Sequence, residues 1–342
     1  MTNTQIDLAT RMTVEFQRLS GFHELIGSGD LDDTAVATLL GTDTATLQQL
    51  RSEMRAVVVD GAKQLLAQPN VRVAIENLPR DYSIAVVGDS QSAGHQSWAE
   101  MLSEMLSQIR PDVQLLNVAK SGDTTMDLVR RLGLALGERR PELYIVFIGG
   151  NDFCRTAPQP GPTFISDEQT RSNLQRIADI VAARGGRLAW VPPAPVRDEV
   201  VAGFPVFQAM GITYTSADSA TKTELFRERP EQLVDLWTTF TPRRLPELLS
   251  QDGLHLSPAG HRAAAERIIL EVLGDVGDVG ERGSSATAYD GKAKRRLRCP
   301  CGELLVAPGD EALIVLAREH LAAQHPGMGA EYTREQILFM AY

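Results

Sequence analysis

Ser90 follows a run of apolar residues and stands where a nucleophile would be exposed. Residues 84–87 read Ile-Ala-Val-Val, and Gly-Asp-Ser follows at 88–90. Such a run predicts a buried strand, and the small residues after it allow a tight turn into a helix. The Ser90 hydroxyl is therefore expected at the carboxyl end of a strand, beside a helix N-terminus. Because Gly-Asp-Ser is also common turn chemistry, the interpretation depends on three further segments.

Asp252 and His255 offer the groups that an activated serine requires. A serine hydroxyl is a weak nucleophile at neutral pH, so it needs a base within hydrogen-bond reach, and the base needs an orienting group. In Asp-Gly-Leu-His the carboxylate can curl back to one imidazole nitrogen while the other nitrogen faces Ser90. The alternative is that Asp252 forms an Asx turn that only orders the loop before the last helix.

Gly122 and Asn151 complete the set of candidate residues. They lie in Asn-Val-Ala-Lys-Ser-Gly (117–122) and Gly-Gly-Asn-Asp (149–152), each at the end of a predicted strand. Taken singly, Gly122 suits a turn and Asn151 a helix cap. The oxyanion that forms after nucleophilic attack, however, needs hydrogen-bond donors placed where its charge develops.

In order and spacing, the four segments resemble the SGNH, or GDSL-type, hydrolase family over residues 81–275. The resemblance implies an α/β fold of three layers, flavodoxin-like, with a parallel sheet, and catalysis without a cofactor. It also implies an oxyanion hole formed by the backbone N–H groups of Ser90 and Gly122 and the side-chain amide of Asn151. A glycine at 122 leaves its N–H open to a substrate because no Cβ blocks the approach.

The expected activity is that of a serine esterase that forms a covalent acyl-enzyme from an ester or thioester. Ser90 would attack, His255 would act as base, Asp252 would orient His255, and water would release the acid. The substrate would be a small-molecule or carrier-linked acyl compound. An acyltransferase, in which an alcohol or amine replaces water, remains the alternative because the same triad serves both.

Several neighbouring residues are interpreted as structural. Asp89 and Asp152 are expected to hydrogen-bond nearby turns, and His261 to be a surface or packing histidine. Cys154 lacks a dedicated base, so it is expected to line the pocket. Arg155 could recognise an anionic substrate, although a solvated arginine is the more frequent outcome.

Apolar strands alternate with helices from about residue 81, which predicts a parallel sheet covered on both faces with the site at its carboxyl edge. Residues 196–250 carry few strand signals and, with the Pro- and Gly-rich 155–163 loop, are expected to shape the acyl pocket. The strands are expected at 84–87, 113–118, 143–148 and 187–191, and the helices near 95–109, 125–137, 167–184 and 259–273.

Residues 1–80 are predicted to form a helical N-terminal domain. Residues 34–50 resemble a helix-turn-helix, so a nucleic-acid-binding regulator is the alternative of a different class. Residues 1–80 carry seven Lys and Arg against ten Asp and Glu. Because phosphate contacts dominate DNA affinity, nucleic acid is disfavoured, and a docking element for a protein partner or a lid is preferred.

The C-terminal part is predicted to be a linker (276–295) followed by a small zinc-finger-like α+β module (296–342). Cys299, Cys301, His320 and His325 are the candidate ligands of a structural zinc ion. Two thiolates and two imidazoles suit four-coordinate zinc, but Cys-x-Cys is tighter than the usual spacing. The alternative is a module without metal and with reduced thiols.

Composition agrees with an enzyme of two or three domains. The chain has 342 residues, a formal net charge of −10 and three cysteines. The sequence shows neither an apolar run near 18 residues nor a leader pattern, so a cytoplasmic protein without a membrane span is expected.

Overall fold

The computed structural model describes residues 7–15, 32–157, 161–278, 294–298, 304–308 and 310–325. The chain divides into two compact units, Met1–Glu281 and Arg282–Tyr342. The first holds the predicted hydrolase segments together with the N-terminal helices. Within the described residues, no helix is both long enough and apolar enough to cross a lipid bilayer.

A five-stranded parallel sheet with the order β2-β1-β3-β5-β7 forms the centre of the first unit. The predicted parallel sheet is therefore confirmed, with β7 as an additional edge strand. The side chains of residues 84–87 are fully buried. This burial explains their continuous apolar run, because a parallel strand that is covered on both faces has no side chain in water. The strands are β1 (Ser83–Gly88), β2 (Gln114–Asn117), β3 (Leu143–Phe147), β5 (Arg187–Val191) and β7 (Gln232–Leu233).

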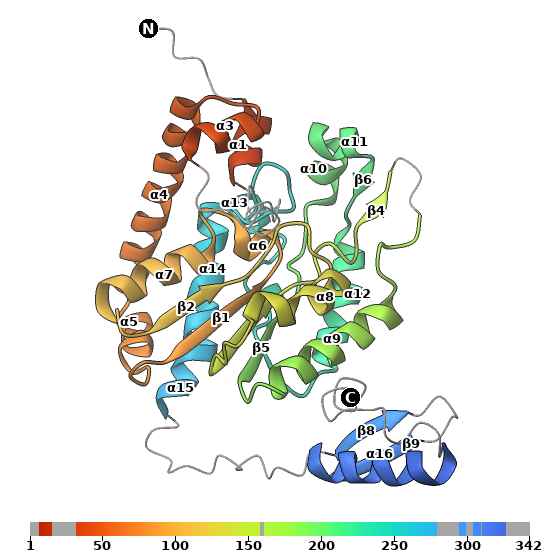
Figure 1. Cartoon of the computed structure of the whole chain (residues 1–342). Helices are drawn as coiled ribbons and strands as arrows, with labels where there is room; N and C mark the ends of the chain where they lie inside the picture. The colour runs from red at the N-terminus through yellow and green to blue at the C-terminus, as the bar shows by residue number, and fades with distance from the viewer. Residues whose placement is uncertain are drawn as a thin grey trace, which may run out of the picture. The chain divides into compact units, whose positions relative to one another are not determined.

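Helices cover both faces of this sheet and make three layers (Figure 1). Alternate β1 residues point to opposite faces: Ile84 packs on the side of α7 (Trp98–Ile109) and α14 (Pro258–Ile268). On the other side, Ala85 meets the buried residues of three further helices. These are α8 (Thr125–Leu136), α9 (Asp167–Ala182) and α12 (Ser216–Arg227).

Of the N-terminal helices, α4 and α5 share the core of the first unit, whereas α1 and α3 pack against the start of α4 in a smaller apolar cluster. Val58 and Leu65 of α4 lie in the same apolar cluster as β1 and α7. The approach of α4 to α7 is close, because a Cβ on Gly61 would lie 2.7 Å from the Met101 sulfur. The helix-turn-helix-like residues fold as α3 and α4 with Gly41 in the turn. The helices are α1 (Leu8–Glu15), α3 (Asp33–Leu39), α4 (Thr44–Leu66) and α5 (Pro69–Glu76).

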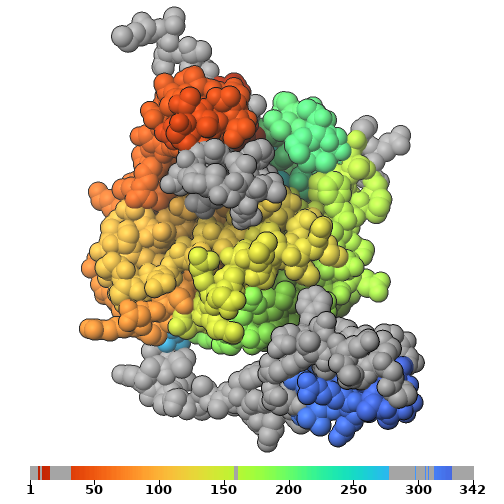
Figure 2. Space-filling view, viewed as in Figure 1, coloured from red at the N-terminus to blue at the C-terminus, as the bar shows by residue number. Residues whose placement is uncertain are grey.

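Short elements stand beyond the carboxyl edge of the sheet and complete the first unit. An aromatic cluster that includes Phe153, Phe204 and Tyr214 packs α10 (Asp198–Gly203), α11 (Pro205–Met210) and β6 (Ile212–Thr213) together. Figure 2 shows α10 and α11, in green, at the same end of the unit as α3, in red-orange. The other short elements at this edge are α6 (Ser90–Ala93), β4 (Arg155–Thr156), η2 (Leu236–Thr238) and α13 (Leu245–Leu248). At the opposite end of the unit, η3 (Ile269–Leu273) and α15 (Gly274–Asp278) continue α14 and contact α5 (Figure 1).

The second unit pairs an antiparallel hairpin with one helix. Strands β8 (Lys294–Arg298) and β9 (Leu304–Pro308) pair in register, and α16 (Asp310–Gln324) packs on them. Leu297, Leu305 and Leu313 are among the buried residues of its small core. Most of the predicted linker 276–295 lies outside the described residues.

Candidate active site

Ser90 opens the short helix α6 directly after β1. Asp89 is the N-cap of this helix and accepts a hydrogen bond from the Gln91 backbone N–H at 3.0 Å. Position 88 requires glycine, because a Cβ there would lie 2.0 Å from the Phe147 carbonyl oxygen. The predicted strand-to-helix turn is therefore present, and it places the Ser90 hydroxyl at the carboxyl edge of the sheet.

His255 lies between Ser90 and Asp252, although Ser90 is 165 residues away in the chain. The His255 Nε2 atom is 3.0 Å from Ser90 Oγ, and Nδ1 is 2.7 Å from Asp252 Oδ2. Asp252 Oδ1 accepts the backbone N–H groups of Leu254 and His255 at 2.8 and 2.9 Å. Asp252 thus both orders its loop, as in the Asx-turn alternative, and orients the imidazole.

The electrostatics of the pair favour a charged Asp252 beside a basic His255. Burial raises the pKa of Asp252, but His255, backbone N–H groups and Ser250 outweigh it and lower this pKa to about 2. For His255, burial lowers the pKa, whereas Asp252, and further Asp89 and Glu15, raise it above the ordinary value. A neutral imidazole with Nδ1 protonated toward Asp252 can accept a proton from Ser90 at Nε2.

Gly122 and Asn151 come from the loops after β2 and β3. The Asn151 Nδ2 atom donates to the Asp123 carbonyl oxygen at 2.9 Å. An amide nitrogen has two N–H bonds, so the second can serve a ligand. Gly122 has a φ of +81° and is exposed, which suits a residue whose N–H is open to a substrate.

Asp89 and Asp152 hold the loops that carry these residues. A Cβ on Gly150 would lie 3.2 Å from Asp89 Oδ2, so the carboxylate packs directly against the loop before Asn151. Burial raises the pKa of Asp89 to about 7. Asp152 accepts the Thr125 backbone N–H at 2.7 Å and joins the loop after β3 to α8.

His261, Cys154 and Arg155 are all engaged in packing or pairing. His261 is buried, accepts the Trp98 backbone N–H at 3.3 Å, and has a pKa lowered by burial to about 3, so it packs and does not lie at the surface. Cys154 belongs to the aromatic cluster. Arg155 forms two 2.7 Å hydrogen bonds to the Asp218 carboxylate and is therefore neither simply solvated nor poised for a substrate.

Gln91 is a positioning residue that the sequence analysis missed. Its side-chain Nε2 donates to the Leu254 carbonyl oxygen at 3.2 Å, and its Oε1 accepts the Leu256 N–H at 3.1 Å. The amide therefore clamps both sides of His255 to the helix that begins with Ser90. Only its place next to Ser90 could have suggested this role.

The structure describes two of the four predicted zinc ligands, His320 and His325. Cys299 and Cys301 lie outside the described residues. His320 and His325 meet at the end of α16, with ring centroids 5.4 Å apart. Within the described ranges, no group of three or more His, Cys, Asp or Glu residues is suited to a metal, so the zinc ion stays a prediction.

The part of the chain that forms the site matches a known protein family. The model of the GDSL-like lipase/acylhydrolase family matches residues 86–263. The arylesterase of Vibrio mimicus is 27% identical over 199 residues, 56% of this chain and 88% of that protein. Esterase TesA of Pseudomonas aeruginosa is 29% identical over 140 residues, 40% of this chain and 62% of that protein.

A solved structure gives a further comparison. The lipase/acylhydrolase from Enterococcus faecalis is 20% identical and has a TM-score of 0.44, with 57% of this chain and 96% of that chain covered. The family model alone spans more than half of the sequence, from β1 into α14. The chain therefore belongs to the GDSL-like lipase/acylhydrolase family.

Proposed function

We propose that this enzyme is a serine esterase that hydrolyses small-molecule esters through a covalent acyl-enzyme. The observation that carries the proposal is the chain of contacts from Asp252 through His255 to Ser90. The names of the similar proteins, an arylesterase and an esterase, support ester hydrolysis as the reaction.

In the first step, the Ser90 oxygen forms a bond to the ester carbonyl carbon while His255 Nε2 takes the hydroxyl proton. The negative charge that develops on the carbonyl oxygen is stabilised by the N–H groups of Ser90, Gly122 and Asn151. The bond between the carbonyl carbon and the alcohol oxygen then breaks, and His255 returns its proton to that oxygen.

Water enters in the second step and attacks the acyl-enzyme. His255 takes a proton from the water, the bond to the Ser90 oxygen breaks, and the proton passes back to Ser90. Asp252 keeps its charge throughout and stabilises the imidazolium that forms in each step.

Fluorophosphonate labelling tests this proposal directly. We expect a single adduct on the wild-type protein by intact-mass measurement, and neither adduct nor ester hydrolysis with Ser90→Ala. Ser92→Ala is the matched control, because Ser92 also lies in α6 but hydrogen-bonds the Trp98 indole. A folded wild-type protein that takes no label would show that the serine is not activated and would overturn the proposal.

A further inference from the structure

Two hydrogen-bonded links join the loops that carry the proposed oxyanion donors. Asn151 lies in the loop after β3, and Gly122 lies in the loop after β2. The first link is the Asn151 side-chain amide, which donates to the Asp123 carbonyl oxygen at 2.9 Å. The second is the Asp152 carboxylate, which accepts the Thr125 backbone N–H and the Thr125 hydroxyl, both at 2.7 Å. The spacing of the two loops therefore depends on Asp152 as well as on Asn151.

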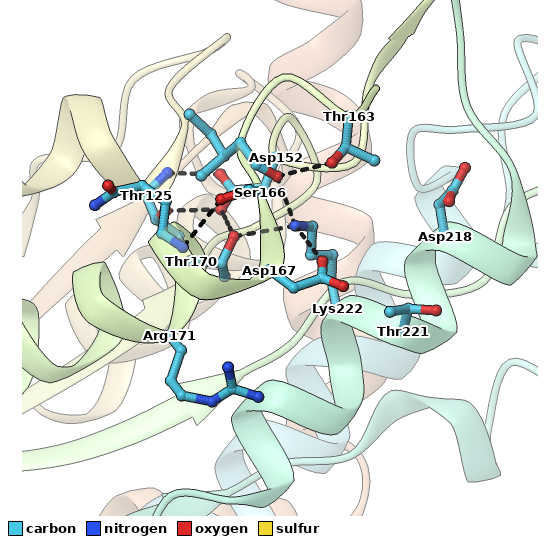
Figure 3. Close-up of polar contacts among 12 residues, drawn as sticks. Thr125, Asp152, Thr163, Ser166, Asp167, Thr170, Arg171, Asp218, Thr221 and Lys222 are labelled. Carbon is cyan, nitrogen blue, oxygen red and sulfur yellow. Dashed lines mark hydrogen bonds and ion pairs between the residues drawn. The ribbon is translucent and has the colours of Figure 1, made fainter. Parts of the chain in front are cut away.

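The hydroxyl protons around Asp152 have a single arrangement. Thr170 on α9 donates its hydroxyl proton to Asp152 Oδ2 at 2.7 Å. The same hydroxyl oxygen accepts the Lys222 ammonium at 3.2 Å (Figure 3), and an ammonium can only donate. Because a hydroxyl has one proton, Lys222 commits that of Thr170 to Asp152. Asn173 directs the Thr125 hydroxyl in the same way, by donating to its oxygen at 2.9 Å.

This network is shielded from water. The side chains of Thr125, Asp152 and Thr170 are fully buried, and that of Lys222 is 1% exposed. Burial raises the pKa of Asp152, whereas hydrogen bonds from Thr125 and Thr170 and the charge of Lys222 oppose this rise. Since water does not replace a missing donor in such surroundings, the loss of one hydroxyl would displace the carboxylate or leave it unsatisfied.

Lys222 supports Asp152 by two routes. The first runs from its ammonium through the Thr170 hydroxyl to the Asp152 carboxylate. In the second, the ammonium donates to the Ile165 carbonyl oxygen at 2.6 Å, and the Ile165 N–H donates to the Asp152 carbonyl oxygen at 3.1 Å. Both the side chain and the backbone of Asp152, the residue next to Asn151, are therefore held from α12.

We propose that Lys222 and Thr170 are positioning residues of the oxyanion hole, which act through Asp152 to fix the Asn151 amide against the neighbouring loop. The inference rests on the proposed function, because Asn151 has an oxyanion to stabilise only if an ester carbonyl is attacked. The positioning residues are buried away from the substrate, so their effect on the reaction passes through Asn151.

A double-mutant cycle with Asn151 tests the proposal. Thr170→Val removes the hydroxyl and keeps nearly the same shape. It should lower kcat for a p-nitrophenyl ester about tenfold with little change in KM, because a misplaced donor weakens the transition state more than the bound substrate. In an Asn151→Ala background, the same substitution should change kcat less than about twofold, since the group that Thr170 positions is absent. Each kcat is expressed per mole of protein that fluorophosphonate labels to completion, which leaves unfolded protein out of the comparison.

Two further threonine variants separate positioning from stability. Thr170→Ser keeps the hydroxyl and should retain kcat within about twofold. Thr223→Val is the matched control, because Thr223 is a buried threonine of α12 whose hydroxyl donates to the Ser219 carbonyl oxygen at 2.9 Å, outside the network. It loses a buried hydroxyl as Thr170→Val does, but its kcat should equal that of the wild type.

Lys222→Met provides a second route to the same measurement and keeps the test decisive where Thr170→Val does not fold. It leaves the Thr170 hydroxyl in place but removes the donor that directs its proton to Asp152. We expect kcat to fall about threefold at constant KM, and the fall to vanish in the Asn151→Ala background.

The outcomes distinguish the two proposals. A kcat that these substitutions lower equally with and without the Asn151 amide, or do not lower at all, would overturn the positioning role and leave the esterase intact. A wild-type enzyme that hydrolyses no ester and takes no fluorophosphonate would instead overturn the proposed function.

Discussion

Among single residues, Asp252 and His255 are expected to set the pH range in which the proposed reaction can proceed. His255 accepts a proton only when it is neutral, and Asp252 raises its pKa above the ordinary value of 6.5. The carboxylate itself stays charged, because its own pKa is lowered to about 2. The pH dependence of ester hydrolysis should therefore report the contact between these two side chains.

We expect kcat/KM to rise with pH through a midpoint above 6.5, as His255 loses its proton. Asp252→Asn removes the negative charge that raises the His255 pKa, so the midpoint should move to lower pH. The rate on the plateau should fall by about 10⁴-fold, because the imidazole loses its orienting partner. Initial rates between pH 5 and 9 measure both effects. An unchanged midpoint would mean that another group controls the acid limb.

Asn151→Ala tests the oxyanion contribution of a side chain. The substitution should lower kcat by about 10²–10³-fold with little change in KM, because the lost hydrogen bond is strongest in the transition state. Steady-state kinetics provide the measurement, with Asn70→Ala on the exposed side of α5 as control. A rise in KM at constant kcat would argue for a role in substrate binding instead.

At the scale of elements, the sheet was predictable because buried parallel strands are continuously apolar. Strands β1, β3 and β5 can be recognised in the sequence by their apolar runs. Strand β7 has only two half-buried residues, Gln232 and Leu233, and therefore carries no such signal. The Gln91 clamp on the 254–256 loop joins residues 163 and 165 positions apart, and sequence spacing cannot reveal such contacts.

The buried Lys222 joins α12 to α9 and to the loop before α9. Its ammonium on α12 donates to the Ile165 carbonyl oxygen at 2.6 Å, to Asp167 at 2.7 Å and to Thr170 at 3.2 Å (Figure 3). Thr170 in turn donates to Asp152 at 2.7 Å. All three ammonium protons therefore have acceptors, and the network ends at the loop that carries Asn151.

Lys222→Met should lower the free energy of unfolding by about 3 kcal/mol, because it leaves buried acceptors of the network without their donor. Urea denaturation followed by circular dichroism measures this loss. Lys63→Met, at an exposed helical position on α4, should change the same quantity by less than about 0.5 kcal/mol. Equal stabilities of the two variants would show that the network contributes no net stability.

At the scale of the whole molecule, the chain combines one large unit with one small unit. The N-terminal helices α4 and α5 share the core of the large unit. Sequence periodicity could not show this, because it identifies a helix but not the elements against which the helix packs. The second unit has a core of few residues, centred on Leu297, Leu305 and Leu313. A core of this size gains much from an additional covalent or metal link.

The second unit is where a zinc ion is expected to act. His320 is buried on α16 and its ring meets that of His325, so two imidazoles are already together. Thiolates from Cys299 and Cys301 would complete a four-coordinate site. Native mass spectrometry of the full chain should show one zinc ion, lost in the double variant Cys299→Ser/Cys301→Ser and retained in Cys154→Ser. Ester hydrolysis should survive the double substitution, because the proposed catalytic groups belong to the first unit. A full chain that binds no zinc would mean that the two histidines serve only as packing residues.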